Sequence, residues 1–97
     1  MNYKQKHLKE TNDFNGGIQK IYQFPNGYGA SVIKHKGSYG YKDNKWELAV
    51  LDADGSLDYT TEVTNDVIGY LNDPEVDRIL KQIEKLWKKL KEVLWVL

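Results

Sequence analysis

The sequence has no cysteine and no long apolar run. Without cysteine, a disulfide framework and any metal site with cysteine ligands are excluded, and the chain suits a reducing cytosol. Because no stretch of about 18 apolar residues is present, no transmembrane helix is expected. The polar N-terminal stretch MNYKQKHLKETND lacks the apolar segment of a signal peptide. We therefore expect a cytoplasmic protein of a single domain, with neither a metal nor a cofactor.

Basic and acidic residues are segregated along the chain, although the net charge is zero. Eight lysines and three acidic residues lie between Met1 and Lys45, whereas nine acidic residues and no Lys or Arg lie between Glu47 and Asp77. Two interpretations stay open. Oppositely charged neighbouring segments neutralise one another on folding, or the acidic part meets a basic partner or imitates nucleic acid. The uniformly basic footprint of a nucleic-acid-binding domain is absent.

Segments rich in β-forming residues alternate with turn signals over residues 18–63. The turn residues are Pro25-Asn26-Gly27, which favours a hairpin, and Asp54-Gly55, where glycine can take a left-handed conformation. Together these patterns predict an antiparallel meander of about four strands within a domain spanning residues 17–97. Because Gly16-Gly17 interrupts the chain before the first strand signal, residues 1–16 are expected to form a polar N-terminal arm. The expected strands start near residues 18, 30, 46 and 57.

Two helices are expected after the strands. Thr64-Asn65-Asp66 has the N-cap chemistry of a short helix over about 65–71. Asp73-Pro74-Glu75 opens a second helix over about 74–95, with Asp73 as its cap. Apolar residues recur every three or four positions from Val76 to Leu97 and form a broad stripe, which suits packing across a sheet. The fold class is therefore α+β, with an antiparallel sheet and a long C-terminal helix on one face.

The second helix is long for a small sheet. It would span about 37 Å at 1.5 Å per residue, whereas a six-residue strand spans about 20 Å. Three placements of its apolar end stay open: folding back, packing on a second copy, or lying on a membrane surface. The lysines and tryptophans of the helix would suit the membrane surface. Of these placements, we keep packing on a second copy as the prediction. The candidate homodimer residues are Trp87, Leu90, Leu94, Trp95 and Leu97.

The stretch FPNGYGASVIKHKGSYGY, residues 24–41, is dense in glycine and tyrosine. Tyrosine brings a large contact area with few rotatable bonds, which favours a protein-binding surface. Nucleotide or single-stranded nucleic-acid binding is an alternative, since tyrosines stack on bases and Lys34, Lys36 and Lys42 could follow phosphates. The candidate binding residues are Asn26, Tyr28, Ser31, His35, Ser38, Tyr39, Tyr41, Lys42 and Trp46.

Catalytic and metal-binding interpretations of the same region are weaker. A small hydrolase would need Ser38 beside the His35 imidazole and a third group to orient it, and no GxSxG motif is present. The glycine-containing segments lie between strands and do not open a helix, as a phosphate-binding loop does. The acidic segment starting at Asp52 has Gly55 at position four, whereas an EF-hand loop needs glycine at position six. We therefore expect a protein without enzymatic activity.

Two long segments resemble a group of small uncharacterised phage and prophage proteins. These segments are YQFPNGYGASVIKHKGSYG and KWELAVLDADGSLDYTTEVTNDVIGYLNDPEVDRILKQIEKL. The group carries a similar F-x-N-G-Y-G-A-S-V…H…S-Y-G…W-E-L-A-V-L pattern, and the resemblance covers about residues 20–86. It implies the cytoplasm of a bacterial host and a protein that contacts a host or defence-system protein, with inhibition of that protein as the candidate role. The matching positions are Asn26, Gly27, Tyr28, Gly29, Ser31, His35, Ser38, Tyr39, Gly40 and Trp46.

Overall fold

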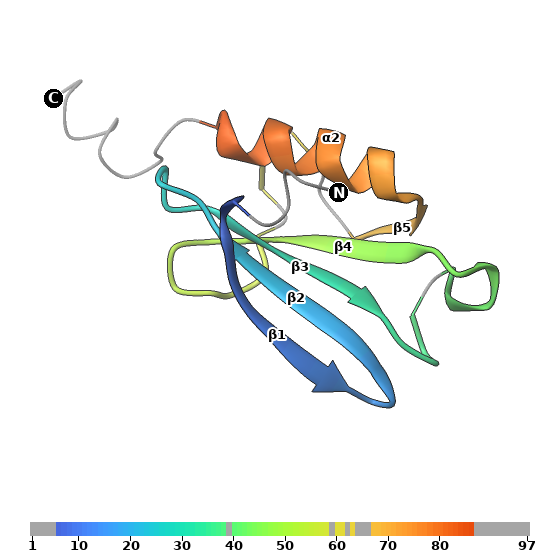
Figure 1. Ribbon diagram of the computed structural model, residues 1–97. Coiled ribbons are helices and arrows are strands. Elements are labelled where there is room, and N and C mark those ends of the chain that lie inside the picture. Colours follow the sequence, from blue (N-terminus) through green and yellow to red (C-terminus); the bar gives the residue numbers. More distant parts are fainter. Residues whose placement is uncertain (1–5, 39, 59, 62, 64–66, 87–97) are drawn as a thin grey trace, which may run out of the picture.

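The computed structural model describes residues 6–38, 40–58, 60–61, 63 and 67–86. In this part of the chain, five strands form one antiparallel sheet in the order β1-β2-β3-β4-β5, and one α-helix, α2, lies across one face (Figure 1). The predicted α+β class, with an antiparallel meander and a helix on one face, is confirmed. The sheet has five strands rather than four. The elements are β1 (Leu8–Phe14), β2 (Gly17–Gln23), β3 (Gly29–Lys34), the short 3-10 helix η1 (Tyr41–Asp43), β4 (Trp46–Leu51), β5 (Ile68–Leu71) and α2 (Asp73–Glu84).

The expected N-terminal arm is wrong for residues 8–14, because these residues form β1 and pair with β2. The turn between the two strands is Asn15-Gly16, whose φ angles are 48° and 78°. Two successive positive φ angles match the right-handed twist of a hairpin, and Asn-Gly is the favoured dipeptide for this turn. Leu8 packs against the hydrophobic core. A polar sequence therefore becomes an edge strand because of the turn that follows it.

The expected short helix at 65–71 is also wrong over residues 68–71, which form the edge strand β5. Trp46 pairs with Leu71 and Leu48 pairs with Ile68, so β5 extends the sheet. Gly69 lowers the helix propensity by about 1 kcal/mol, and the open edge of β4 offers backbone partners in its place. The expected cap residues 64–66 lie outside the described residues.

The predicted fourth strand at 57–63 is reduced, among its described residues, to an isolated bridge between Leu51 and Leu57. The carboxylate of Asp58 explains why the strand does not continue. It accepts hydrogen bonds from the backbone N–H of Thr60 at 2.8 Å and from the Thr60 hydroxyl at 2.6 Å. Such a local side-chain turn competes with a strand ladder.

The hydrophobic core lies between α2 and the face of the sheet that it covers. Val76, Ile79, Leu80 and Ile83 are buried on the helix, at the predicted spacing of three and four residues. They pack against buried side chains of the sheet, among them Tyr22, Ala30, Val32, Trp46, Leu48 and Val50.

Both ends of α2 differ from the expected ones. The N-cap is Asn72 rather than Asp73, because Asn72 and Glu75 form a reciprocal capping box. The helix ends at Glu84 rather than near residue 95. Residues 87–97, which include the candidate dimer residues Trp87, Leu90, Leu94, Trp95 and Leu97, lie outside the described residues. In the described part, no helix is long and apolar enough to cross a membrane.

Candidate binding surface

The glycine- and tyrosine-rich stretch is divided between two ends of the sheet. Residues 24–28 connect β2 to β3 beside the C-terminal end of α2, whereas residues 35–45 connect β3 to β4 near β5 (Figure 1). A six-residue strand separates them, which corresponds to about 20 Å. We call the first region the capped end, and include residues 52–57 in it because Leu51 pairs with both Gly29 and Leu57. We call the second region, with β5, the tyrosine end.

At the capped end, the side chain of Asn26 binds the last turn of α2. Its Nδ2 donates to the carbonyl oxygens of Ile83, Glu84 and Leu86 at 2.8, 2.9 and 3.0 Å. Its Oδ1 accepts from the backbone N–H of Tyr28 at 3.0 Å. The last carbonyls of a helix lack intrahelical partners, and the Asn26 amide supplies N–H donors to the carbonyls here. This predicted binding residue uses both of its polar atoms to hold the fold together.

Tyr28 and Trp46 are core residues. Tyr28 is buried, and burial raises the pKa of its hydroxyl, with nearby Asp58 raising it further. Trp46 is 6% exposed, and its Nε1 donates to Asp73 Oδ1 at 2.8 Å. Neither aromatic ring offers a free face to a partner. The predicted binding residues Tyr28 and Trp46 therefore pack in the hydrophobic core.

Ser38 and His35 form a tight turn through their backbone rather than through the imidazole. The Ser38 hydroxyl donates to the His35 carbonyl at 2.8 Å and accepts from the His35 N–H at 3.0 Å. The Nδ1 of His35 accepts from the Gly37 N–H at 3.2 Å. The His35 ring also packs edge-on against Phe14, with centroids 4.8 Å apart. These contacts shape the turn after β3 and do not form a serine–histidine pair.

Ser31 lies on the face of the sheet opposite α2, since its neighbours Ala30 and Val32 belong to the core. A polar ladder crosses three strands there. Asn12 donates to Gln19 at 3.3 Å, and Gln19 donates to the Ser31 hydroxyl at 3.1 Å. Ser31 is thus remote from Asn26 and from Tyr41, and the predicted site residues do not form one cluster.

Two predicted residues stay exposed at the tyrosine end. Tyr41 is 39% exposed and Lys42 is exposed, both on η1. Tyr39, also a predicted site residue, lies outside the described residues. The left-handed backbone of Gly40 and Asn44, with φ angles of 88° and 59°, allows the chain to turn into and out of this short helix.

The structure adds Tyr70, which the sequence interpretation missed. Tyr70 is 58% exposed and has a φ angle of 59°. The pairing of β5 is irregular between Trp46 and Leu48, which marks a bulge opposite Glu47. A left-handed backbone is uncommon for a residue with a large side chain and costs about 1–2 kcal/mol. The bulge turns this tyrosine outward, and Gly69 before it is the sequence signal that could have indicated it.

Gly40 brings η1 against Tyr70. A Cβ atom placed on Gly40 would lie 3.0 Å from the Tyr70 Cα and 3.1 Å from the Lys45 Cβ. Only glycine allows the loop backbone to approach β5 so closely. Tyr41 and Tyr70, which are 29 positions apart, therefore belong to one region. We call Gly40, Tyr41, Lys42 and Tyr70 the tyrosine surface.

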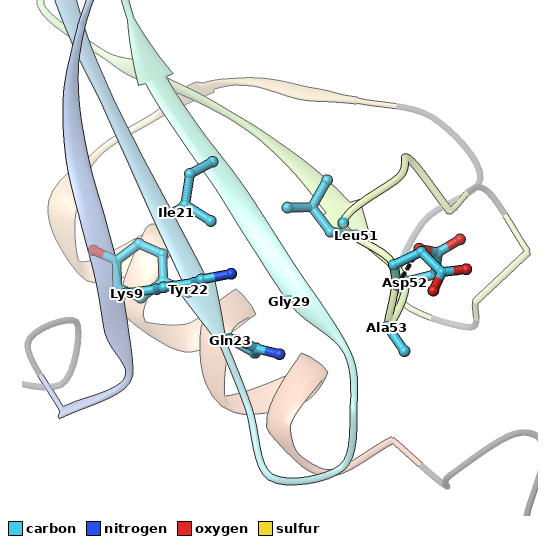
Figure 2. A pocket seen from close by; sticks show the side chains of 10 residues that line it. Lys9, Ile21, Tyr22, Gln23, Gly29, Leu51, Asp52 and Ala53 are labelled. Carbon is cyan, nitrogen blue, oxygen red and sulfur yellow. Dashed lines mark hydrogen bonds between the residues drawn. The ribbon is translucent and has the colours of Figure 1, made fainter.

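A small pocket lies at the capped end, on the face of the sheet away from α2. Figure 2 shows Ile21 and Leu51 on either side of Gly29, with Lys9 and Asp52 at the margins. A Cβ on Gly29 would lie 2.3 Å from the Tyr22 carbonyl oxygen, so close strand packing requires glycine there. The pocket volume is about 90 Å³, well below the roughly 300 Å³ of a typical small-molecule site.

The described residues contain no group of three or more His, Cys, Asp or Glu side chains that could hold a metal ion. The acidic turn after β4 has a local explanation, since Asp52 Oδ1 accepts from the backbone N–H groups of Asp54 and Ser56 at 2.9 and 3.0 Å. Comparison with known proteins finds no matching family model, curated protein or solved structure. The candidate site therefore depends on its own geometry.

Proposed function

We propose that this chain is a non-catalytic binding protein that contacts a partner protein through its tyrosine surface. The observation that carries the proposal is Tyr70, which combines a left-handed backbone with a side chain that is 58% exposed. An exposed ring gains little from burial in its own fold, so packing does not account for the strained backbone. Backbone strain of this kind is concentrated at functional sites.

The chemistry of the surface suits a protein partner. Tyrosine offers a large apolar body with a polar tip, and it is enriched among the residues that dominate binding energy. Gly40 allows the backbone before Tyr41 to lie against the backbone of Tyr70, so both tyrosines are presented from one region of the fold. Two exposed tyrosines in one region are a protein-binding feature that needs no catalytic group.

We propose a host or defence-system protein in the bacterial cytoplasm as the partner, on the resemblance to phage and prophage proteins. The alternative functions draw less support from the geometry. Base stacking would need open aromatic faces, and because Trp46 and Tyr28 are buried, it would rest among the described residues on Tyr41 and Tyr70. A hydrolase would need the Ser38 hydroxyl at the His35 imidazole, whereas that hydroxyl bonds to the backbone.

The test is capture from a bacterial host lysate by the full chain and by two variants. Tyr41→Ala/Tyr70→Ala removes the tyrosine surface. Leu57→Ala is the matched control, since Leu57 is 53% exposed and lies at the capped end. We expect a protein that is captured by the wild type and by Leu57→Ala and is lost with the double tyrosine variant. Equal capture by all three, or no capture above a scrambled-loop control, would contradict the proposal.

A further inference from the structure

Two lysines converge on the buried indole next to the tyrosine surface. The Nζ of Lys34 lies 4.2 Å from the centroid of the Trp46 ring, and the Nζ of Lys20 lies 5.5 Å from it. The two ammonium groups are therefore at most about 10 Å apart. We call Lys20 and Lys34 the lysine pair.

Neither lysine of the pair forms an ion pair with a described residue. Lys34 donates to the neutral amide oxygen of Asn44 at 3.1 Å. The nearby carboxylate of Asp73 accepts from the indole N–H. Two like charges at about 10 Å repel each other, and they do so more strongly in a less polar environment than in water. An anion between them would remove this repulsion.

The lysine pair is also preorganised. A cation over an aromatic face is attracted to it, and both lysine side chains are only partly exposed. Holding two long side chains against one ring reduces the rotamer freedom that an anion would otherwise have to restrict on binding. The arrangement thus favours a ligand with a negative group near the centre of the pair.

The position of the pair links it to the proposed partner. Trp46 pairs with Leu71, the residue after Tyr70. Lys34 is the last residue of β3, and the loop that follows adds Lys36, Lys42 and Lys45 against one acidic residue, Asp43. The tyrosine end therefore carries both exposed tyrosines and an excess of positive charge.

We infer that the partner of the tyrosine surface presents an acidic protein segment, with a carboxylate bound by Lys20 and Lys34; this inference rests on the proposed function. A nucleic acid fits less well. Trp46 is 6% exposed and has no free face on which a base could stack between the two lysines. A protein segment can place its carboxylates at the pair and its apolar groups on the tyrosines.

The probe is hexaglutamate, titrated into the ¹⁵N-labelled full chain while the backbone and indole N–H signals are followed by NMR. We expect shifts at Trp46 and its neighbours, with an affinity that falls by about threefold or more between 20 and 200 mM salt. Lys20→Gln/Lys34→Gln should abolish the shifts at Trp46, and Lys34→Arg alone should retain them. Lys85→Gln, an exposed lysine just after α2, should leave them unchanged.

Three results would overturn the inference: no shift near Trp46 at any concentration, shifts that persist in the double glutamine variant, or tighter binding of hexathymidylate than of hexaglutamate. Thermal unfolding of each variant shows that the fold is retained. Tyr70→Ala separates this inference from the proposed function, because it removes partner capture but should keep hexaglutamate binding. Capture that depends on Tyr70 without any hexaglutamate binding would leave the proposed function standing and refute the acidic partner.

Discussion

The two ends of the sheet use their polar and aromatic residues in opposite ways. At the capped end, Asn26 gives both of its polar atoms to the fold, and Tyr28 is buried. At the tyrosine end, Tyr41 and Tyr70 are exposed and are held by backbone conformations that favour glycine. Residues 24–41 are rich in glycine and tyrosine throughout, yet one end of the sheet uses them to stabilise the fold and the other end presents them on its surface. The predictions below test this division, from the largest expected effect to the smallest.

Replacing Asn26 with alanine should lower the free energy of unfolding by about 2 kcal/mol, because the carbonyls at and just after the C-terminal end of α2 lose the N–H donors of this amide. Asn26→Asp should cost at least as much, since a carboxylate cannot donate and is unfavourable at the negative end of the helix dipole. Urea unfolding measures both. If Asn26→Ala changed stability by less than about 0.5 kcal/mol while abolishing capture, Asn26 would belong to a binding surface instead.

Replacing Gly40 with alanine should cost about 1–2 kcal/mol of backbone strain and also displace η1 from Tyr70. Gly55→Ala is the matched control. Gly55 has a φ angle of 82°, close to the 88° of Gly40, but a Cβ there meets nothing within 4 Å. We expect both variants to lose stability and only Gly40→Ala to lose partner capture. Equal capture by both would show that the contact between Gly40 and Tyr70 is irrelevant to binding.

The buried Tyr22 should make the protein sensitive to alkali. Burial raises the pKa of its hydroxyl above the ordinary 10.0, and Asp77 raises it further. In the unfolded chain this tyrosine ionises near pH 10, whereas in the folded chain it stays neutral, so stability is complete below pH 10 and falls as the pH rises above it. Tyr22→Phe should reduce this alkaline loss, as measured by urea unfolding at pH 8 and pH 11. At pH 8 the variant should be nearly as stable as the wild type, because the Tyr22 hydroxyl has no hydrogen-bond partner among the described residues. An unchanged alkaline slope would contradict this explanation.

The change in stability that we expect at Tyr70 is also small. Tyr70→Gly relieves the strain of a left-handed backbone but adds freedom to the unfolded chain, so these effects partly cancel and the net change should be under about 1 kcal/mol. Partner capture should nevertheless be lost. A loss of stability above about 2 kcal/mol would instead make Tyr70 a structural residue.

The fold was predictable from the sequence where local chemistry and packing agree. The alternation in β4 and the apolar spacing of α2 both satisfy the same core, so the sheet and the helix on one face could be inferred. β1 was missed because its own residues are polar, and its strand depends on the Asn15-Gly16 turn and on pairing with β2. β5 was missed because a four-residue edge strand is determined by the neighbouring β4 rather than by its own propensity.

The candidate site was only partly predictable for the same reason. Tyr41 and Lys42 were identified by residue type, but Tyr70 joins them through a contact between distant segments. Asn26 and Trp46 were grouped with them because they are close in sequence. Their structural roles depend on α2, which begins 47 residues after Asn26 and 27 residues after Trp46.

The central claim is that a partner binds at the tyrosine end and not at the capped end. The most direct measurement is photo-crosslinking in host lysate, with benzoylphenylalanine at position 70 in one protein and at position 57 in another. The two native side chains are 58% and 53% exposed, so accessibility is matched. We predict a crosslinked product of defined mass from position 70 and none from position 57. A product from position 57 alone, or no product from either position, would contradict the account.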